Sequence, residues 1–351
     1  MTVAIKSLSL IIPGLLDETN PQAIGDQIRQ HASLRCLLDR ADAVHANLSG
    51  FERTMMQVAT GECDSMSYAW LSRQGEQDEQ AHMPVQRAWL RVDPVYMQAD
   101  RDNVVLFGAQ ALAIQQDEAD SLVAELNTTY TDLDWVFEAP IPQRWYLHIP
   151  TPPRIRCTPI EDTIGQNVRD RLPDGEDRLF WHRTLNEIQM LFYQSPVNLA
   201  RREAGNTEIN SVWIWGNGQQ ELPATVLKSD QVGWSHFWGE EILLRGLGIA
   251  SDITIKPLPE HANTWLDHKP SGNHLAVLPG LNQDGDDVRD RATVLQQYEQ
   301  DWFTPLLSML RSRQINAVEI WPCNGMVYRV TRSGLLRFWR KSGWQKTVQL
   351  T

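Results

Sequence analysis

The residues best suited to holding a ligand gather between positions 198 and 218. Asn198, Arg201 and Asn210 supply amide and guanidinium groups, which suit carboxylate or phosphate oxygens. Gly216 and Gly218 follow an apolar run, and glycine at the end of a strand lets the backbone approach a ligand closely. A structural role fits as well: the asparagines cap or bridge neighbouring turns and the arginines are solvated. The residues alone leave both interpretations open.

Two hydroxyl groups are candidate nucleophiles by position, those of Ser49 and Thr54. Such a hydroxyl attacks only when a base or a metal ion activates it. Neither residue lies in a catalytic motif, and a lone hydroxyl in a polar loop usually caps a turn. We therefore name no catalytic residue and keep these two as candidates for the case that the chain is an enzyme.

Possible metal ligands lie in two later segments. His261 and His268 stand either side of an aspartate and His274 follows, a grouping that can bind a metal. Their spacing matches no standard ligand pattern and prolines bound the segment, so we expect a surface loop. Asp284 and Asp286 belong to a carboxylate-rich turn, which is usually solvated. We expect no cofactor, and manganese or zinc only if the chain is an active enzyme.

The composition restricts the class of protein. The net charge is −12, which argues against a nonspecific nucleic-acid binder. The basic cluster from Arg332 to Lys341 is interleaved with apolar residues, so we expect it on the solvated side of a strand. Four cysteines without CxxC pairing indicate reduced thiols. The apolar stretch at residues 7–16 is shorter than the roughly 20 residues that span a bilayer. These features predict a cytoplasmic protein without a membrane segment.

The beginning of the chain predicts a parallel sheet. "SLSLIIPGLL" at 7–16 is typical of a buried strand followed by a Pro-Gly turn, and residues 21–41 have the apolar spacing of a helix. A strand, a loop and a helix in this order form a βα unit. Ligands usually bind where such strands end at their carboxyl side.

The middle of the chain has a different pattern of apolar and polar residues. Alternation over 88–107 predicts two strands, 115–130 predicts a helix, and 143–149 predicts another strand. A proline-rich extended connection follows at 149–162. This block indicates a smaller α+β subdomain inserted at about 91–209. At the end of the chain, residues 326–341 predict a terminal hairpin about Ser333 and Gly334.

Several motifs together resemble the archaeal-type cofactor-independent phosphoglycerate mutases. That family has an "IIPDGMAD" strand end, a strand containing an arginine, a particular helix, and a segment N-x-x-R-x-x-x-G…A-N-x-x-W-x-W-G-x-G, in this order. This chain carries "IIPGLLD" at 11–17, "AWLRVDP" at 88–94 with Arg91, and a similar helix within 107–127. The last segment matches at Asn198, Arg201, Gly205, Asn210, Trp213, Trp215, Gly216 and Gly218.

The resemblance covers residues 1–250 and implies an α/β fold of the alkaline phosphatase type. The expected architecture is a core with a largely parallel sheet, formed by 1–90 and 210–351, and an inserted smaller α+β subdomain with its connection at 91–209. Within that superfamily the chain looks most like the proteobacterial branch labelled Rpf-type regulatory proteins.

The chain departs from the family where the family binds two metal ions. Gly14 stands where the family has an aspartate after the proline. The segment that matches the family's "DEAGHEGD" is 278–287, which contains no histidine. Near the family's late Asp-His pair, Glu319 is the only acid. Two metal ions clamp the attacking and leaving oxygens in this mechanism, so these losses should abolish it.

Three functions follow for comparison. The first is a non-catalytic regulatory or binding protein that keeps the fold; its ligand would be a small phosphorylated or carboxylated metabolite, held by Arg91, Asn198, Arg201 and Asn210. Trp213 and Trp215 could add an aromatic platform. The second is an active phosphomutase or phosphatase with rearranged metal ligands. The third is an assembly factor whose aromatic-rich surface meets a protein partner.

Overall fold

The computed structural model describes most of the 351 residues. The described ranges are 5–16, 21–46, 48–63, 66–76, 87–100, 103–218, 220, 233–268, 271–281, 291–337, 339 and 344.

The chain forms two compact units. The core unit consists of Met1–Cys63 and Leu222–Thr351, and the inserted unit consists of Asp64–Glu221. The inserted unit is therefore longer at both ends than the expected range of 91–209. The reason is that strand β3 begins at Ala88 and pairs with β9, whose last residue is Trp215, so both strands belong to the same sheet.

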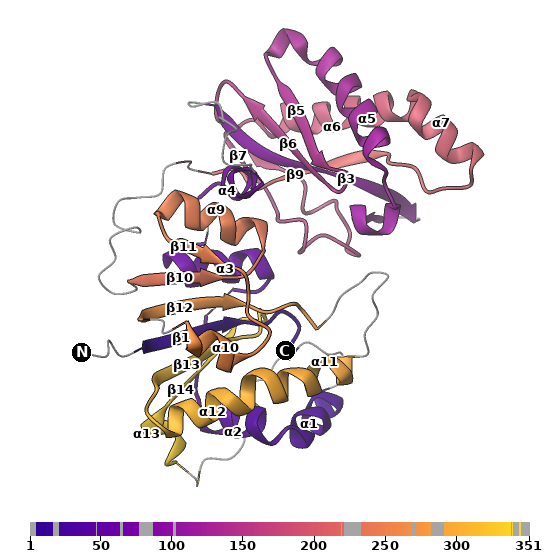
Figure 1. Cartoon of the computed structure of the whole chain (residues 1–351). Helices are drawn as coiled ribbons and strands as arrows, with labels where there is room; N and C mark the ends of the chain where they lie inside the picture. The colour runs from indigo at the N-terminus through magenta and orange to yellow at the C-terminus, as the bar shows by residue number, and fades with distance from the viewer. Residues whose placement is uncertain are drawn as a thin grey trace. The chain divides into compact units, whose positions relative to one another are not determined.

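The core unit is built on a seven-stranded sheet with the order β11-β10-β12-β1-β13-β14-β2 (Figure 1). The first five strands in this order are parallel, and β14 runs antiparallel to β13 and β2. The largely parallel α/β core expected from the sequence is confirmed. The strands are β1 (Ile5–Ile11), β2 (Asp42–His45), β10 (Trp234–Trp238), β11 (Thr254–Lys256), β12 (Gly272–Val277), β13 (Ile315–Trp321) and β14 (Met326–Thr331).

Helices of the core unit pack on this sheet through apolar residues. Leu8 and Leu10 of β1 share one buried cluster with Leu34 and Leu37 of α2 and with Leu306 of α12. The region predicted as one helix at 21–41 is two helices, because the backbone at His31 is extended. The helical segments are α1 (Pro21–Gln30), α2 (Ala32–Arg40), α3 (Phe51–Thr60), α9 (Ile242–Ser251), α10 (Ala262–Asp267), α11 (Arg291–Tyr298), the π-helical η3 (Glu299–Phe303), α12 (Thr304–Arg311) and α13 (Arg332–Leu335).

The predicted terminal hairpin is wrong. The Thr331 side chain accepts a hydrogen bond from the Gly334 backbone N–H at 3.1 Å and caps α13, so Ser333 and Gly334 lie in a helical turn. Strand β14 already pairs with β13 on one side and β2 on the other, which leaves no edge for a further strand. Arg332 consequently lies in a helix and not on the solvated side of a strand; the predicted basic positions Arg340 and Lys341 lie outside the described residues.

The inserted unit has an antiparallel sheet with the order β4-β3-β6-β5, and β9 also pairs with β3. Its long strand β3 pairs with β6 through its first residues, then with β9, and finally with β4. The two strands predicted over 88–107 and the strand at 143–149 are confirmed. The strands are β3 (Ala88–Asp100), β4 (Asn103–Phe107), β5 (Val136–Ile141), β6 (Arg144–Ile149) and β9 (Ser211–Trp215), with a separate pair of β7 (Ile155–Arg156) and β8 (Asp174–Gly175).

The two faces of the inserted sheet differ in chemistry. Because side chains alternate along a strand, Leu90 and Val92 of β3 face the apolar cluster formed with α5 and α6, while Trp89 packs with α4 on the other face. The arginine and aspartate of β3 share that second face with Trp89. The helices are α4 (Tyr68–Gly75), η1 (Ala109–Leu112), α5 (Gln116–Thr129), η2 (Thr131–Leu133), α6 (Arg178–Gln194) and α7 (Pro196–Glu203).

Candidate functional site

A buried ion pair occupies the α4 face of the inserted sheet. The Arg91 guanidinium donates through Nε to Asp93 Oδ1 at 3.0 Å and through Nη2 to both carboxylate oxygens at 2.7 and 2.8 Å. Trp215 Nε1 donates to Asp93 Oδ2 at 2.6 Å. Burial works against the charge of Arg91, but the adjacent Asp93 carboxylate outweighs it and holds the pKa of Arg91 above its usual value. The Asp93 carboxylate therefore joins Arg91 and Trp215 on this face of the sheet.

Sequence reasoning missed Asp93. It lies in the same strand motif as Arg91, two residues on, so the two side chains point to the same face of the strand. Two residues of opposite charge, two positions apart in a predicted strand, could have indicated this ion pair from the sequence.

Aromatic rings and a second acid enclose the Arg91 guanidinium. Its carbon lies 4.9 Å from the ring centroid of Trp215 and 5.3 Å from that of Tyr146, distances typical of cation–π contacts. The Tyr146 hydroxyl donates to Glu76 Oε1 at 2.6 Å, and burial raises the pKa of Tyr146. Arg144 contacts the same oxygen, while Glu76 Oε2 is buried without a hydrogen-bond partner in the described structure.

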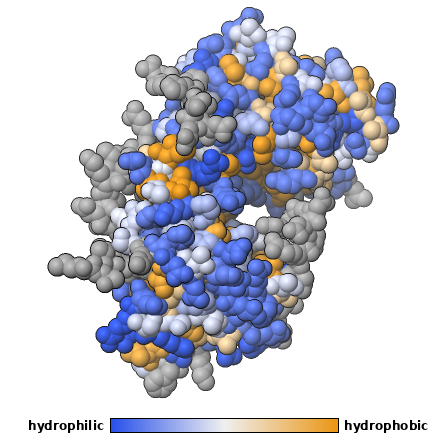
Figure 2. All heavy atoms as spheres, viewed as in Figure 1, coloured by the Kyte–Doolittle hydropathy of each residue, from blue (hydrophilic) through white to orange (hydrophobic). Residues whose placement is uncertain are grey.

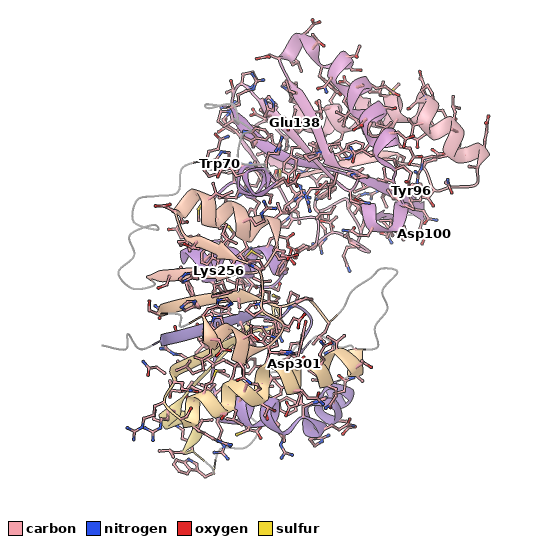
Figure 3. The ribbon with its side chains drawn as sticks, in the orientation of Figure 1. Trp70, Tyr96, Asp100, Glu138, Lys256 and Asp301 are labelled. Carbon is pink, nitrogen blue, oxygen red and sulfur yellow. The ribbon has the colours of Figure 1, made fainter. Side chains whose placement is uncertain are left out.

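A second cluster of polar side chains lies around Glu138 of β5 (Figure 3). Arg73 Nε donates to Glu138 Oε2 at 2.7 Å, and His148 Nε2 lies 3.5 Å from Oε1. Burial alone would raise the pKa of Glu138, but the bonds from His148 and Arg73 outweigh it and lower that pKa. The acid is thus held as a carboxylate by its neighbours.

Gly216 and Gly218 lie in close contact with the backbone at the start of α4. The Gly216 carbonyl accepts hydrogen bonds from the Ala69 N–H at 3.0 Å and from the Ser67 hydroxyl at 3.1 Å. A Cβ atom at Gly218 would lie 2.4 Å from the carbonyl carbon of Met66. The close backbone approach expected from these glycines therefore occurs with the segment that begins α4.

Asn198 bridges two stretches of backbone. Its Nδ2 donates to the carbonyls of Phe192 and Ile209, both at 2.8 Å, and its Oδ1 accepts from the Ile209 N–H at 2.9 Å. The side chain is fully buried. This geometry matches the bridging role that the sequence left open.

Arg201 is also bonded within the protein. Its Nε donates to the Thr207 carbonyl at 2.8 Å, Nη1 donates to Glu118 Oε2 at 2.6 Å, and Nη2 contacts the Leu112 carbonyl. Only 3% of the residue is exposed, so the expectation of a solvated arginine is wrong.

Asn210 and Trp213 complete the predicted set. Asn210 Oδ1 accepts from the Met97 N–H at 2.8 Å and its Nδ2 donates to the Met97 carbonyl at 2.9 Å. Trp213 is fully buried, and its Nε1 donates to the Thr158 carbonyl at 2.9 Å. The structure thus brings Arg91, Trp215 and Gly216 together but gives Asn198, Arg201, Asn210 and Trp213 separate partners.

The two candidate nucleophiles lie at the start of α3 in the core unit. Thr54 is buried and its hydroxyl donates to the Gly50 carbonyl at 2.7 Å, so it stabilises the first turn of the helix. Ser49 is exposed, just before the N-cap residue Gly50. Neither hydroxyl has a base or an acid bonded to it in the described structure.

The two described candidates for metal ligands, His261 and His274, have separate partners. His261 Nδ1 lies 3.1 Å from Asp301 Oδ1, whereas His274 is fully buried in β12 and its Nδ1 accepts from Trp238 Nε1 at 2.9 Å. Asp284 and Asp286 lie outside the described residues. Among the residues that are described, no three histidine, cysteine, aspartate or glutamate side chains form a possible metal site.

The loop after β1 carries a cationic side chain instead. Arg291, the first residue of α11, donates through Nη1 to the Gly14 carbonyl at 2.7 Å and through Nη2 to the Leu15 carbonyl at 3.0 Å. Its Nε donates to Gln27 Oε1 at 3.1 Å. The guanidinium is therefore held at the carboxyl end of a central parallel strand, the usual position of ligand sites in such sheets.

The largely parallel sheet of the core unit defines an α/β protein. Its chain is interrupted by an inserted unit that has an antiparallel sheet of its own. The PH0037 protein of Pyrococcus horikoshii has the same fold: its structure aligns over 94% of this chain and 88% of its own with a TM-score of 0.58, at 13% identity. No protein-family model matches the sequence.

In sequence, the chain is similar to 2,3-bisphosphoglycerate-independent phosphoglycerate mutases. It is 37% identical over 126 residues to the enzyme of Methanosarcina mazei and 30% identical over 126 residues to that of Methanosarcina acetivorans. Each match covers 36% of this chain and 31% of the relative, so it spans about a third of the length of these curated relatives. The degenerate branch expected from the sequence stays a prediction.

None of the helices in the described parts of the chain is long and apolar enough to cross a membrane.

Proposed function

We propose that this phosphoglycerate-mutase-like chain acts by binding a ligand or a protein partner, in a regulatory role, and does not perform metal-dependent phosphoryl transfer. The support comes from the residues at the carboxyl edge of the core sheet. The inserted unit would then serve as a binding module on a fold inherited from an enzyme.

The Arg291 guanidinium on the β1 loop carries this proposal. Position 14 holds glycine where the resembled family has an aspartate, and the carbonyls of Gly14 and Leu15 accept hydrogen bonds from Arg291. A fixed positive charge at this position repels a divalent cation, whereas an aspartate would attract one. Among the described residues, the charged side chain bound to this loop is therefore a cation, where the resembled family has an acid.

Glu319 does not compensate for the missing ligands. Its Oε2 accepts from the Ser9 hydroxyl at 3.0 Å, and its Oε1 lies 3.5 Å from Arg329 Nε. Both oxygens are thus engaged along β13, within the sheet. A two-metal site requires several converging acids and histidines, and the described residues of the core unit do not fit that requirement.

An assay of phosphoglycerate mutase activity tests the proposal. The purified full chain is assayed with manganese, cobalt or zinc, with an EDTA control, beside the Methanosarcina mazei enzyme as a positive control. We expect no activity above background from protein shown to be folded by circular dichroism. Turnover that EDTA abolishes would refute the proposal and favour the alternative, an active mutase or phosphatase with a rearranged metal site.

Two kinds of binding partner follow from the described surface. An anionic metabolite would have to displace Asp93 from Arg91, because that guanidinium is already paired. A protein partner could use the exposed apolar residues at the start of α6, Leu179 and Phe180. On the face of the inserted unit seen in Figure 2, apolar residues lie among hydrophilic ones. All four cysteines are free thiols, so we propose a cytoplasmic location.

A further inference from the structure

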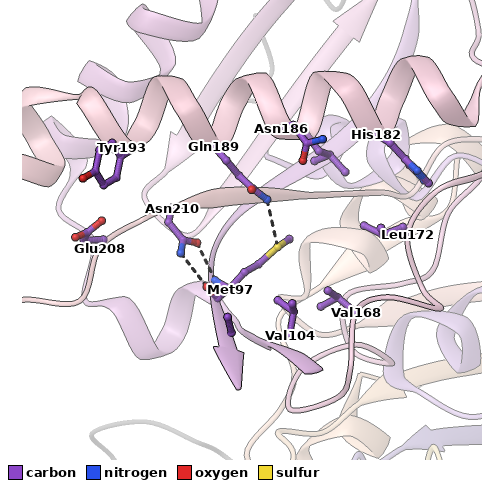
Figure 4. A pocket seen from close by; sticks show the side chains of 12 residues that line it. Met97, Val104, Val168, Leu172, His182, Asn186, Gln189, Tyr193, Glu208 and Asn210 are labelled. Atoms are coloured by element: carbon purple, nitrogen blue, oxygen red, sulfur yellow. Dashed lines mark hydrogen bonds between the residues drawn. The ribbon is translucent and has the colours of Figure 1, made fainter. Parts of the chain in front are cut away.

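A cavity of about 550 Å³ lies on the inserted unit, lined by neither Arg91 nor Asp93 and open to solvent where Ala99, Asn186 and Tyr193 are exposed (Figure 4). One wall is a face of α6, and the opposite side is formed by β3, β4 and the segment that contains Val168 and Leu172. Small-molecule sites usually measure about 300–1,000 Å³, so this cavity is large enough for a compact ring system.

The wall formed by α6 is mostly polar and, apart from Leu185, consists of histidine, amide and tyrosine side chains. His182, Asn186, Gln189 and Tyr193 are spaced by four, three and four residues, which places them on one face of the helix. Figure 4 shows these side chains pointing from α6 into the cavity. Asn186 has no hydrogen-bond partner among the described residues. The Gln189 amide makes only long contacts, 3.7 Å to Met97 Sδ and 3.4 Å to the hydroxyl of Ser211.

The opposite side is apolar and fixed in place. It includes Met97, Val104, Val168 and Leu172. Asn210 holds the Met97 backbone through two hydrogen bonds, which Figure 4 shows as dashed lines. The asparagine predicted to bind a ligand therefore acts as a positioning residue for the floor of this cavity. A methionine floor suits the face of an aromatic ring.

The charge of the lining selects against anions. None of the described residues that line the cavity is a lysine or an arginine, and the one acid is Glu208. Glu208 Oε1 lies 3.0 Å from Arg202 Nη1, at an angle that makes no hydrogen bond. Arg202 and Glu208 offset each other's charge at this edge, and the described lining itself holds no lysine or arginine that would bind a phosphate or carboxylate. The ligand that fits is uncharged.

We propose that this cavity binds an uncharged heteroaromatic compound of nucleoside size, with its ring edge on Asn186 and Gln189 and its face on Met97. A carboxamide offers one donor and one acceptor side by side, which is the pattern that asparagine and glutamine use to recognise adenine edges. The proposal rests on the binding role proposed above. It concerns a different site from the β1 loop, so its failure would leave the mutase assay unaffected.

Calorimetric titration of the full chain with adenosine tests the proposal, with AMP as the charged counterpart. We expect saturable one-to-one binding of adenosine and weaker binding of AMP. Gln189→Ala and Asn186→Ala should each weaken adenosine binding about tenfold, the cost of one hydrogen bond. Ala99→Trp, on the exposed part of β3 that lines the cavity, should block binding by filling it.

Met190→Ala is the matched control, because Met190 lies on the same helix and is 67% exposed outside the cavity. It should leave the adenosine affinity unchanged. No saturable binding of adenosine to the folded wild-type chain would overturn the proposal. Binding that Ala99→Trp leaves unchanged, or AMP binding as tight as adenosine binding, would overturn it too.

Discussion

Arginine and asparagine side chains that look free in the sequence are bonded to the protein itself. The Arg91 guanidinium has Asp93 on its Nε and Nη2 atoms, and the Arg201 guanidinium has Glu118 on Nη1. Buried charges of this kind are stable only when paired. The same residue types that recognise anions are here used to fix the inserted unit.

Asp93→Asn is predicted to destabilise the inserted unit strongly. It would leave Arg91 buried without a counter-charge, and breaking a buried pair from one side costs about 3–5 kcal/mol. Urea unfolding followed by tryptophan fluorescence measures the change. Asp134→Asn is the matched control, because the Asp134 side chain is 70% exposed in its pair with Arg87. Removing that charge should lower the free energy of unfolding by at most about 1 kcal/mol. Equal losses in the two variants would contradict the assignment.

Acid is predicted to destabilise the core unit through His274. Burial, together with the His236 ring stacked at 5.1 Å and with Lys256, lowers the pKa of His274 to about 4. The unfolded chain therefore takes up this proton before the folded chain does. The stability that depends on neutral His274 is complete above the unfolded pKa of 6.5 and is lost as the pH falls towards 4, by about 2–3 kcal/mol in all.

The variant His274→Asn isolates this effect. An asparagine oxygen can accept the Trp238 Nε1 hydrogen bond in place of the imidazole nitrogen but does not titrate. Burial also lowers the pKa of His236, which remains in both proteins. Unfolding free energies measured from pH 7 to pH 4 should fall less steeply in the variant. A slope equal to that of the wild type would rule out His274 as the titrating group.

At the scale of elements, local patterns predicted much of the fold. The stretch at 7–11, with buried Leu8, Leu10 and Ile11, lies in β1, and the acidic first turn and apolar spacing of 115–130 form α5. Alternation over 88–107 predicted β3 and β4 because one face of that sheet packs on α5 and α6. These patterns succeed because each is set by which side of the element is buried.

The candidate site could not be predicted in the same way. The partners of Arg201 lie 83 and 89 residues away in sequence, at Glu118 and Leu112, and Arg291 contacts the β1 loop from 276 and 277 residues away. A single sequence carries no signal for such pairings. The terminal hairpin failed for a related reason, since β2 already occupies the edge of β14.

The junction of β9 with the start of α4 gives a prediction at this scale. Gly218→Ala should destabilise the inserted unit by about 1–3 kcal/mol, the cost of overpacking, because the added Cβ would lie 2.4 Å from the Met66 carbonyl carbon. Gly233→Ala serves as the control, since a Cβ at Gly233 meets nothing within 4 Å. Thermal unfolding of both variants measures the difference. A Gly218→Ala variant as stable as the control would show that this approach is not tight.

At the scale of the whole molecule, the core unit is built on a largely parallel sheet and holds an arginine at the loop after β1. Gly14 and Leu15 bind the Arg291 guanidinium where the resembled family has an aspartate. The inserted unit has its own sheet, its own apolar core and a cavity of its own. This combination is the basis for proposing a binding protein.

Calorimetric titration of the metal-free full chain with Mn²⁺ tests the central claim most directly, because it requires no knowledge of the substrate. The Methanosarcina mazei mutase provides the comparison. We predict that this chain binds no pair of Mn²⁺ ions in this titration. Two equivalents bound per chain with comparable affinity would contradict the account, and would show that a two-metal site exists despite Gly14 and Arg291.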